Sequence, residues 1–340
     1  MKRRLTRKNK RRKKQLIIFS TICLLLVMAS GYAAFSTNLS LKAKGNIKCN
    51  PINVEDLKTL VVTQGDGLYK DITDEYRYIY KGTNPNNFLQ FDNILYRIIS
   101  IEEDNSIKVV RQYPIIQNAF DKAGTRYLEN SYCGTDIVNT WGCNVWGSKT
   151  TIVDEYGNHV SKMAYSDDNN LYELPSDEAY LNKYLNLDWF NSLNDKIKVK
   201  IISHRFNVGH VDITKNQNIE LDIKDEKKYG WNGKIGLINI TDYVKASNNI
   251  ECINVYSSST YGGNKCSKNN YLNKSEEYLV QWTINPSKNS RSDTIDIIPL
   301  EGSEKIGSIG NIYAFPSFFL SNSIELCGQG TEQNPYYIID

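Results

Sequence analysis

The sequence predicts a mixed α+β domain preceded by a hydrophobic N-terminal helix. Segments that alternate apolar and polar residues, as strands do, occur at 88–111 and again between 295 and 339. Segments with helical spacing lie between them, without the regular strand–helix alternation of a parallel βαβ sheet. Residues 16–35 carry no charge, and twenty helical residues match the thickness of a bilayer.

Charge divides the chain into two unlike parts. Ten of the first 14 residues are basic and none is acidic, whereas the remaining 31 basic and 38 acidic residues give the rest a net charge of −7. A basic head before an apolar segment stays in the cytoplasm, and the chain after it is exported. Residues 1–15 are therefore predicted to be a basic cytoplasmic head, with no nucleic-acid partner. The exported part is expected on the extracellular face of the cell membrane or in the secreted fraction.

Residues 16–35 are predicted to be a signal peptide or a transmembrane anchor. The apolar residues 16–28 precede the small residues 29–34, which is the order of a secretory signal. Residues 31–36 resemble the export signals of biofilm-fibre and camelysin-like proteins of Gram-positive bacteria, which implies cleavage between Ala34 and Phe35. Without cleavage, the segment would hold the protein in the cytoplasmic membrane. Both alternatives stay open at this point.

The exported part is expected to form one domain with long loops. No Gly/Ser tract, Pro run or internal repeat interrupts it. We expect a stalk and entry segment at 36–74 and an extracellular α+β domain at 75–340.

Six cysteines lie outside the apolar segment, and an even number on an exported chain indicates disulfides. Turn-forming residues between neighbouring cysteines favour the pairs Cys133–Cys143 and Cys252–Cys266, which leaves Cys49 with Cys327. Buried free thiols are one alternative. A zinc site is another, but there is no CxxC motif and the three histidines are scattered.

Individual elements follow from local patterns. Residues 88–91, 94–101 and 107–111 are expected to form a strand meander with a turn at 104–106. Ser176 is expected to cap a helix that continues to residue 193. Residues 196–202 fit a strand or a helix. Residues 234–240 are expected to form a buried strand, followed by a short helix that Thr241 or Asp242 caps. Later strands are expected at 295–300, 312–315, 317–320 and 336–339.

The chain lacks the common catalytic motifs. The glycine-rich phosphate loops, GxSxG and HExxH are all missing. His204 and His210 would share one face of a strand and, beside Asp212, are candidates for an acid–base or metal pair, although ordinary hydrogen-bonded histidines are more common. Residues 166–170 offer oxygen ligands for calcium but do not match an EF-hand. We therefore predict no metal, no cofactor and no enzyme activity.

Aromatic residues are the more suggestive feature, because the chain holds 23 Tyr and 5 Trp. Several lie in loops beside the predicted disulfides, where an aromatic face and a neighbouring amide could hold a sugar. Trp side chains also commonly anchor long loops to a core. The ligand-binding candidates are Trp141, Trp146, Tyr261, Trp282 and Asn285.

Several segments occur in a characteristic order, among them WNGKIGLIN at 231–239, WTINP at 282–286 and GTEQNPY at 330–336. Taken together, they resemble an uncharacterised family of surface proteins of gut Firmicutes that share a domain of unknown function. The family is distantly similar to the formylglycine-generating-enzyme branch of the C-type-lectin-like fold, which implies an irregular α+β domain with ligand-presenting loops. The family's Arg before the late Pro is replaced by Ala314 and Phe315. The metal-binding cysteine pair of the oxidase branch has no counterpart here, so oxidase activity does not carry over.

These observations predict an exported binding module on the surface of a Gram-positive bacterium that recognises a glycan or a surface protein. The alternatives are a structural surface or matrix protein, and an enzyme that acts on the cell wall or on glycans.

Overall fold

The computed structural model describes residues 49–73, 76–165, 170–213, 219–249, 251–252, 266–273, 279–298 and 302–339. They belong to a unit that begins at Cys49. The expected boundary at residue 75 is therefore wrong, because residues 49–73 are built into this unit: Cys49 is bonded to Cys327, and Val54 and Leu57 are buried in the core. The predicted head, the segment 16–35 with Ala34 and Phe35, and Tyr261 lie outside the described residues.

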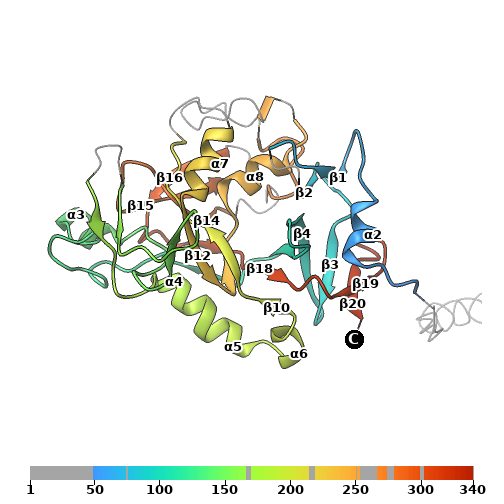
Figure 1. The fold of residues 1–340 in the computed structure, drawn as a ribbon, viewed down its shortest axis with the longest axis horizontal. Coiled ribbons are helices and arrows are strands. Elements are labelled where there is room, and N and C mark those ends of the chain that lie inside the picture. Colours follow the sequence, from blue (N-terminus) through green and yellow to red (C-terminus); the bar gives the residue numbers. More distant parts are fainter. Residues whose placement is uncertain are drawn as a thin grey trace, which may run out of the picture. The chain divides into compact units, whose positions relative to one another are not determined.

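The fold is mixed, with many short strands and a few short helices (Figure 1). No helix in the described ranges is long and apolar enough to cross a membrane. The helical elements are α2 (Val54–Lys58), α3 (Asp136–Trp141), α4 (Tyr180–Lys183), the π-helical segment η1 (Tyr184–Trp189), α5 (Phe190–Ser192), α6 (Asp195–Lys198), α7 (Ile219–Lys227) and α8 (Ile240–Ala246).

Strands form four sheets within the described residues, and the largest of these has ten strands. Its members are β1 (Gly67–Lys70), β2 (Tyr78–Lys81), β3 (Phe88–Phe91), β4 (Ile94–Ile101), β5 (Ile107–Arg111), β10 (Ile201–Ile202), β13 (Ile235–Gly236), β18 (Ser317–Leu320), β19 (Glu325–Cys327) and β20 (Tyr336–Ile339). The predicted meander is confirmed with its bounds, as β3, β4 and β5. A tight turn at 104–106 joins β4 to β5.

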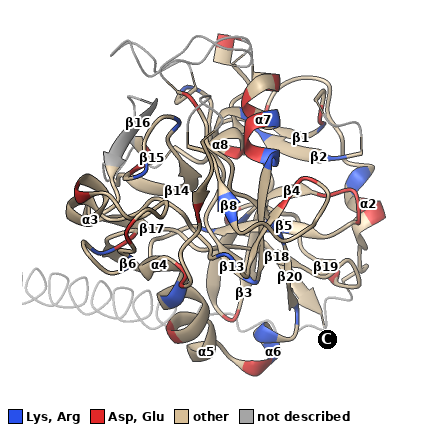
Figure 2. Ribbon diagram, turned by 60° about the vertical axis from the view of Figure 1, so that its left-hand side comes forward, with Lys and Arg blue, Asp and Glu red and all other residues tan. Residues whose placement is uncertain are grey.

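The smaller sheets hold the remaining strands. One runs in the order β16 (Gly302–Gly307), β15 (Asp293–Ile298), β14 (Gln281–Pro286), β17 (Ile312–Ala314) and β6 (Ile116–Asn118). A second contains β11 (His204–Asn207), β12 (Tyr229–Gly233) and β7 (Ile152–Asp154), and a third pairs β8 (Lys162–Met163) with β9 (Tyr172–Glu173). Figures 1 and 2 place α7 and α8 on one side of the strands and α4 to α6 on the opposite side.

Two helix starts differ from the prediction. Ser176 does not cap the predicted helix. That helix begins with α4 at Tyr180, and its N-cap residue Ala179 makes no side-chain hydrogen bond. The expected strand 234–240 is limited to β13, and α8 starts at Ile240. Its N-cap is Asn239 rather than Thr241 or Asp242, because the Asn239 backbone N–H donates to the Asp242 carboxylate three residues later. The ambiguous residues 196–202 are divided between α6 and β10.

The three predicted disulfides are confirmed and account for all six cysteines of the described residues. They join Cys49 to Cys327, Cys133 to Cys143 and Cys252 to Cys266, with Cα–Cα distances of 5.8, 5.5 and 4.7 Å. Paired cysteines of this kind are typical of proteins that fold in an oxidising compartment.

Candidate functional site: a charged pocket beside α8

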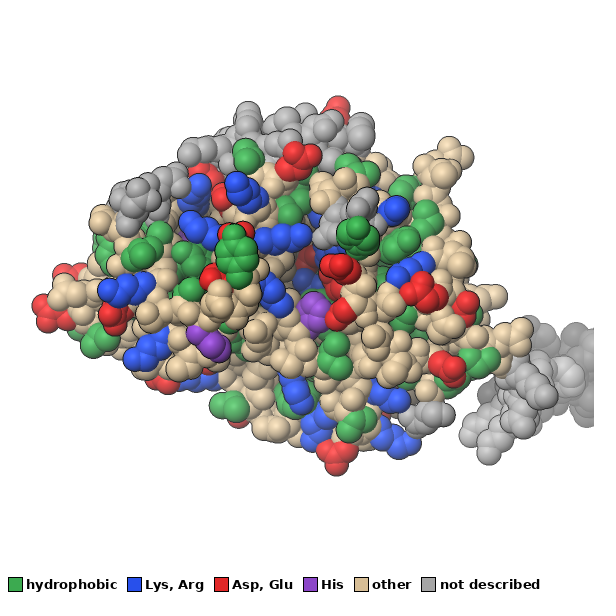
Figure 3. Space-filling view, viewed as in Figure 1, with side chains coloured by type: hydrophobic (Ala, Val, Ile, Leu, Met, Phe, Trp, Pro, Cys, Tyr) green, Lys and Arg blue, Asp and Glu red, His purple; other side chains and the backbone are tan. Residues whose placement is uncertain are grey.

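A cavity of about 570 Å³ opens between α7, α8, β11 and the turn that joins β4 to β5. Figure 3 shows acidic and basic side chains and a histidine around a hollow near the centre of this face. Figure 2 shows that acidic and basic residues are also interspersed along α7. The pocket is therefore lined by side chains of both charges rather than by an apolar surface.

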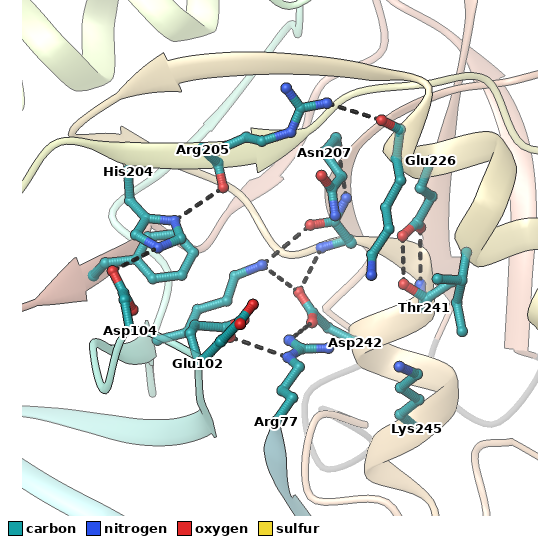
Figure 4. A pocket seen from close by; sticks show the side chains of 16 residues that line it. Arg77, Glu102, Asp104, His204, Arg205, Asn207, Glu226, Thr241, Asp242 and Lys245 are labelled. Carbon is teal, nitrogen blue, oxygen red and sulfur yellow. Dashed lines mark hydrogen bonds and ion pairs between the residues drawn. The ribbon is translucent and has the colours of Figure 1, made fainter. Parts of the chain in front are cut away.

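Asp242, in the first turn of α8, organises the floor of the pocket (Figure 4). Its Oδ2 accepts from Lys108 Nζ at 2.6 Å and from the Asn239 N–H at 3.0 Å, and its Oδ1 accepts from Arg77 Nη2 at 2.9 Å. Lys108 also donates to Asn239 Oδ1 at 3.1 Å. The same carboxylate thus closes the capping box of α8 and neutralises two buried cations.

Arg77 and Lys245 extend this ion-pair network. Arg77 Nε donates to Glu102 Oε1 at 3.1 Å, and its Nη1 lies 3.8 Å from Asp71 Oδ2. Lys245 Nζ donates to the same Asp71 oxygen at 2.7 Å. Bases and acids from the chain before β2, the connection between β4 and β5, β5 and α8 therefore meet in one cluster, which fixes their side chains before any ligand arrives.

The network sets the protonation of its carboxylates. Burial alone would raise the pKa of Asp242, but Lys108 and Arg77 hold it well below its ordinary value. Burial likewise opposes the ionisation of Asp71, yet Lys245 and Arg77 keep its pKa below the ordinary value. Both residues are therefore ionised near neutral pH.

Glu226 on α7 behaves in the opposite way. Its carboxyl group is buried and accepts the Thr241 N–H at 3.1 Å and the Thr241 hydroxyl, as Figure 4 shows. Burial, reinforced by the negative charge of Asp242, raises the pKa of Glu226 to about 8. At neutral pH the pocket thus contains one carboxylic acid that is mostly protonated beside one that is ionised.

The rim carries the groups that solvent reaches. The His204 ring stacks on Phe319 with centroids 3.8 Å apart. Its Nδ1 lies 3.1 Å from the Arg205 carbonyl oxygen and its Nε2 lies 3.5 Å from Asp104 Oδ2, so both nitrogens are oriented. Arg205 donates to the carbonyl oxygens of Asp154 and Lys227, which ties β11 to the end of α7.

Two of the predicted ligand contacts, Trp146 and Trp282, are core residues instead. Each side chain is only 1% exposed. Both pack against Phe120, with ring centroids 5.4 and 5.8 Å from it, and the Trp282 indole N–H donates to the Asn118 carbonyl oxygen at 2.8 Å. They anchor the surrounding loops to the core, which was the alternative interpretation, and cannot touch a ligand.

Asn285 is also buried and acts as a support. Its Oδ1 accepts the N–H of Ile240 at 2.9 Å, and its Nδ2 donates to the Gly209 carbonyl oxygen at 3.3 Å. It therefore holds the start of α8 from behind the pocket rather than contacting a ligand. Trp141 is half exposed at the end of α3 and does not line the charged pocket.

His204 and His210 do not form the predicted pair. Strand β11 ends at Asn207, so the alternation that would place both on one face stops before His210. His210 is buried and its Nε2 lies 2.5 Å from the Tyr132 hydroxyl, whereas His204 lies at the rim of the charged pocket. Asp212 is buried and lines neither that pocket nor the smaller one at His210.

Most of the proposed calcium loop, residues 166–169, lies outside the described residues. Among the residues that are described, no group of three His, Cys, Asp or Glu side chains is arranged to hold a metal ion. Comparisons of the chain with protein-family models, curated proteins and solved structures found no match.

Sequence reasoning missed most of the pocket. The sequence predicts Asp242 only as an alternative helix cap, and places Lys108 only within the strand 107–111. The available signal was Lys108 itself, which lies in a strand whose neighbours Ile107, Val109 and Val110 are all apolar. A lysine in a strand that is buried on both faces requires an acidic partner, and here α8 provides it.

Proposed function

We propose that the chain is an exported binding module of a Gram-positive cell surface and that its charged pocket binds a glycan. The observation that carries this proposal is the cavity of about 570 Å³ with a floor of interlocked ion pairs. That volume is within the range of small-molecule sites, and groups held in place before binding lose little entropy on binding. The disulfides and the resemblance to a C-type-lectin-like surface family support an extracellular ligand-binding role.

A saccharide suits this pocket better than a protein surface does. Protein interfaces are centred on apolar residues and are depleted in charge at their core, whereas this pocket is lined by carboxylates, ammonium groups and amides. Sugar hydroxyls donate and accept hydrogen bonds, so they match a lining that offers both. The stacked rings of His204 and Phe319 add a flat apolar surface at one wall.

A second candidate, an enzyme acting on the wall or on glycans, is favoured by Glu226 alone. A protonated carboxyl beside an ionised one is the arrangement that many hydrolases use for acid–base catalysis. Asp242, however, already accepts from Lys108, Arg77 and its own capping amide, so it is a fixed counter-ion and not an available nucleophile. Binding is therefore the better-supported function.

The test is a glycan array probed with the full chain, with His204→Ala and Trp141→Ala as matched variants. Both residues are aromatic and reach solvent, but only His204 lines the pocket. We expect a defined set of glycans to bind the wild type, His204→Ala to weaken binding about 10-fold, and Trp141→Ala to leave it unchanged. The absence of any bound glycan would refute the proposal. A larger loss of binding in Trp141→Ala than in His204→Ala would place the site at α3 instead. Release of reducing ends from a bound glycan would instead identify the enzyme.

A further inference from the structure

The charges that line the pocket are sorted by depth. Glu103 and Asp104 lie exposed at the rim, where water and salt screen them. Lys108, Lys245 and Arg77 lie deep, with side chains 4%, 6% and 13% exposed. The carboxylates of Asp242 and Asp71 lie equally deep, with side chains 2% and 1% exposed, so the inner end holds three cations against two ionised carboxylates.

A charge count supports this. Among the described residues, the lining holds five bases (Arg77, Lys108, Arg205, Lys227 and Lys245) and five acids (Glu102, Glu103, Asp104, Glu226 and Asp242). Behind the lining, buried Lys81 and Asp71 offset each other. Because Glu226 is mostly protonated at neutral pH, the site carries one positive charge without an internal partner.

The deep ammonium groups also keep donors for a ligand. An ammonium group has three N–H bonds. In the described part of the chain, Lys108 donates to Asp242 and Asn239, and Lys245 donates to Asp71 alone. Both residues line the cavity, so their remaining N–H groups are the available donors at its inner end.

The Thr241–Glu226 pair provides a further donor, but only in one protonation state. When Glu226 is neutral, the pair contains two hydroxyl protons; one is shared between the two side chains and the other is left for a ligand acceptor. When Glu226 is ionised, the single hydroxyl proton of Thr241 is bound by the carboxylate. The pair then offers only acceptors and an additional negative charge.

We infer that the pocket selects acidic saccharides, and that the carboxylate of a uronic-acid residue lies at the inner end against Lys108, Lys245 and the Thr241–Glu226 pair. The sugar ring would occupy the outer part, next to the rim carboxylates and the His204–Phe319 stack. One excess positive charge matches a monoanion rather than a phosphate dianion. This inference rests on the proposed glycan-binding function and names the class of glycan.

The same geometry predicts that binding depends on pH. The charged groups near Glu226 are Asp242 and Lys245 on α8, Lys108 on β5, Arg77 before β2, Arg205 on β11, and Asp225 and Lys227 on its own helix. Within this set, burial lowers the pKa of Lys245 from its ordinary value and raises that of Glu226 to about 8. Raising the pH through that value adds a negative charge beside the ligand carboxylate and removes a donor, so an acidic sugar binds less tightly.

The experiment is an NMR titration of the full chain with D-glucuronate and D-glucose, which differ only at C6. At pH 6.5 we expect glucuronate to bind at least about 10-fold more tightly than glucose. Lys245→Gln should remove this preference, whereas Lys183→Gln, at an exposed pair with Asp177, should preserve it. Equal affinity for the two sugars overturns this inference but leaves glycan binding intact, and no binding of either sugar overturns both. Tighter binding of inorganic phosphate or of glycylglycine also overturns the assignment to an acidic sugar.

Glu226→Gln is the second variant, because a carboxamide has the same shape and stays neutral at every pH. Wild-type affinity for glucuronate should fall about 10-fold between pH 6.5 and 9, as a charge is added within the low-dielectric site. The affinity of Glu226→Gln should stay constant, and that of wild type for glucose should change little. A parallel fall in wild type and variant would show that the Thr241–Glu226 pair does not contact the carboxylate.

Discussion

Arg126 and Lys108 are both buried cations, but only Lys108 lines a cavity that a ligand could enter. Arg126 lies beneath the Cys133–Cys143 loop, where its Nε donates to Asp121 at 3.0 Å and its two Nη atoms donate to four backbone carbonyl oxygens, those of Cys143, Val145, Gly147 and Asp177. Lys108 is equally buried, yet it donates to two acceptors and lines a cavity. Burial of a charge is common to both regions. The cavity beside Lys108, and an ammonium group with only two acceptors among the described residues, are what distinguish the pocket from the site of Arg126.

Replacing Arg126 should have the largest effect on stability, because Arg126 joins the buried Asp121 to four backbone carbonyl oxygens. Arg126→Met leaves the buried Asp121 carboxylate and several carbonyl oxygens without their main donor, so we expect a loss of about 3–5 kcal/mol in the free energy of unfolding. Urea denaturation measures it. Lys162→Met is the control, since its pair with Glu173 is exposed and should contribute less than about 1 kcal/mol. Similar losses in both variants would mean that Asp121 is satisfied without Arg126.

The Cys133–Cys143 disulfide should have the next largest effect. It closes a loop over a sequence separation of 10 residues, so chain entropy assigns it about 2–3 kcal/mol. Cys133→Ala together with Cys143→Ala should lower the free energy of unfolding by that amount, as measured by urea denaturation. The affinity of the charged pocket should be unchanged, because neither cysteine lines it. A loss of affinity in the folded variant would show that the two regions are coupled.

These two regions also show what the sequence can predict. The cysteine pairs follow from parity, loop length and turn residues, and the β3–β4–β5 meander follows from alternation, because both depend on residues that are close in the chain or on simple counting. The prediction that Trp146 and Trp282 contact a ligand fails because both rings are buried against Phe120. Phe120 is distant from them in the sequence, and no local pattern indicates which Trp faces the core.

The pocket could not be predicted for a related reason. Its central contacts join residues that are far apart in sequence, with Lys108 paired to Asp242 across 134 positions and Lys245 to Asp71 across 174. Each residue alone is an ordinary charged side chain on a strand, a loop or a short helix. Only the packing of α8 beside β2, with Lys108 of β5 reaching Asp242, makes them one site, and that packing is a property of the tertiary fold.

The smallest effect, taken over one pH unit, concerns Glu226, and it tests whether burying this carboxyl group changes the stability of the folded protein. Because the folded-state pKa of Glu226 is raised to about 8, the folded protein binds one more proton than the unfolded chain between the ordinary Glu pKa and that value. This contribution to stability is therefore present at low pH and is lost as the pH rises towards 8, with a slope of at most about 1.4 kcal/mol per pH unit. Glu226→Gln lacks the titrating group, so its free energy of unfolding should decline less steeply than that of wild type between pH 5 and 8. Identical slopes of the free energy of unfolding against pH in the two proteins would show that Glu226 is solvated like an ordinary surface carboxylate. The pocket would then not differ from the Arg126 region in the protonation of its carboxyl groups.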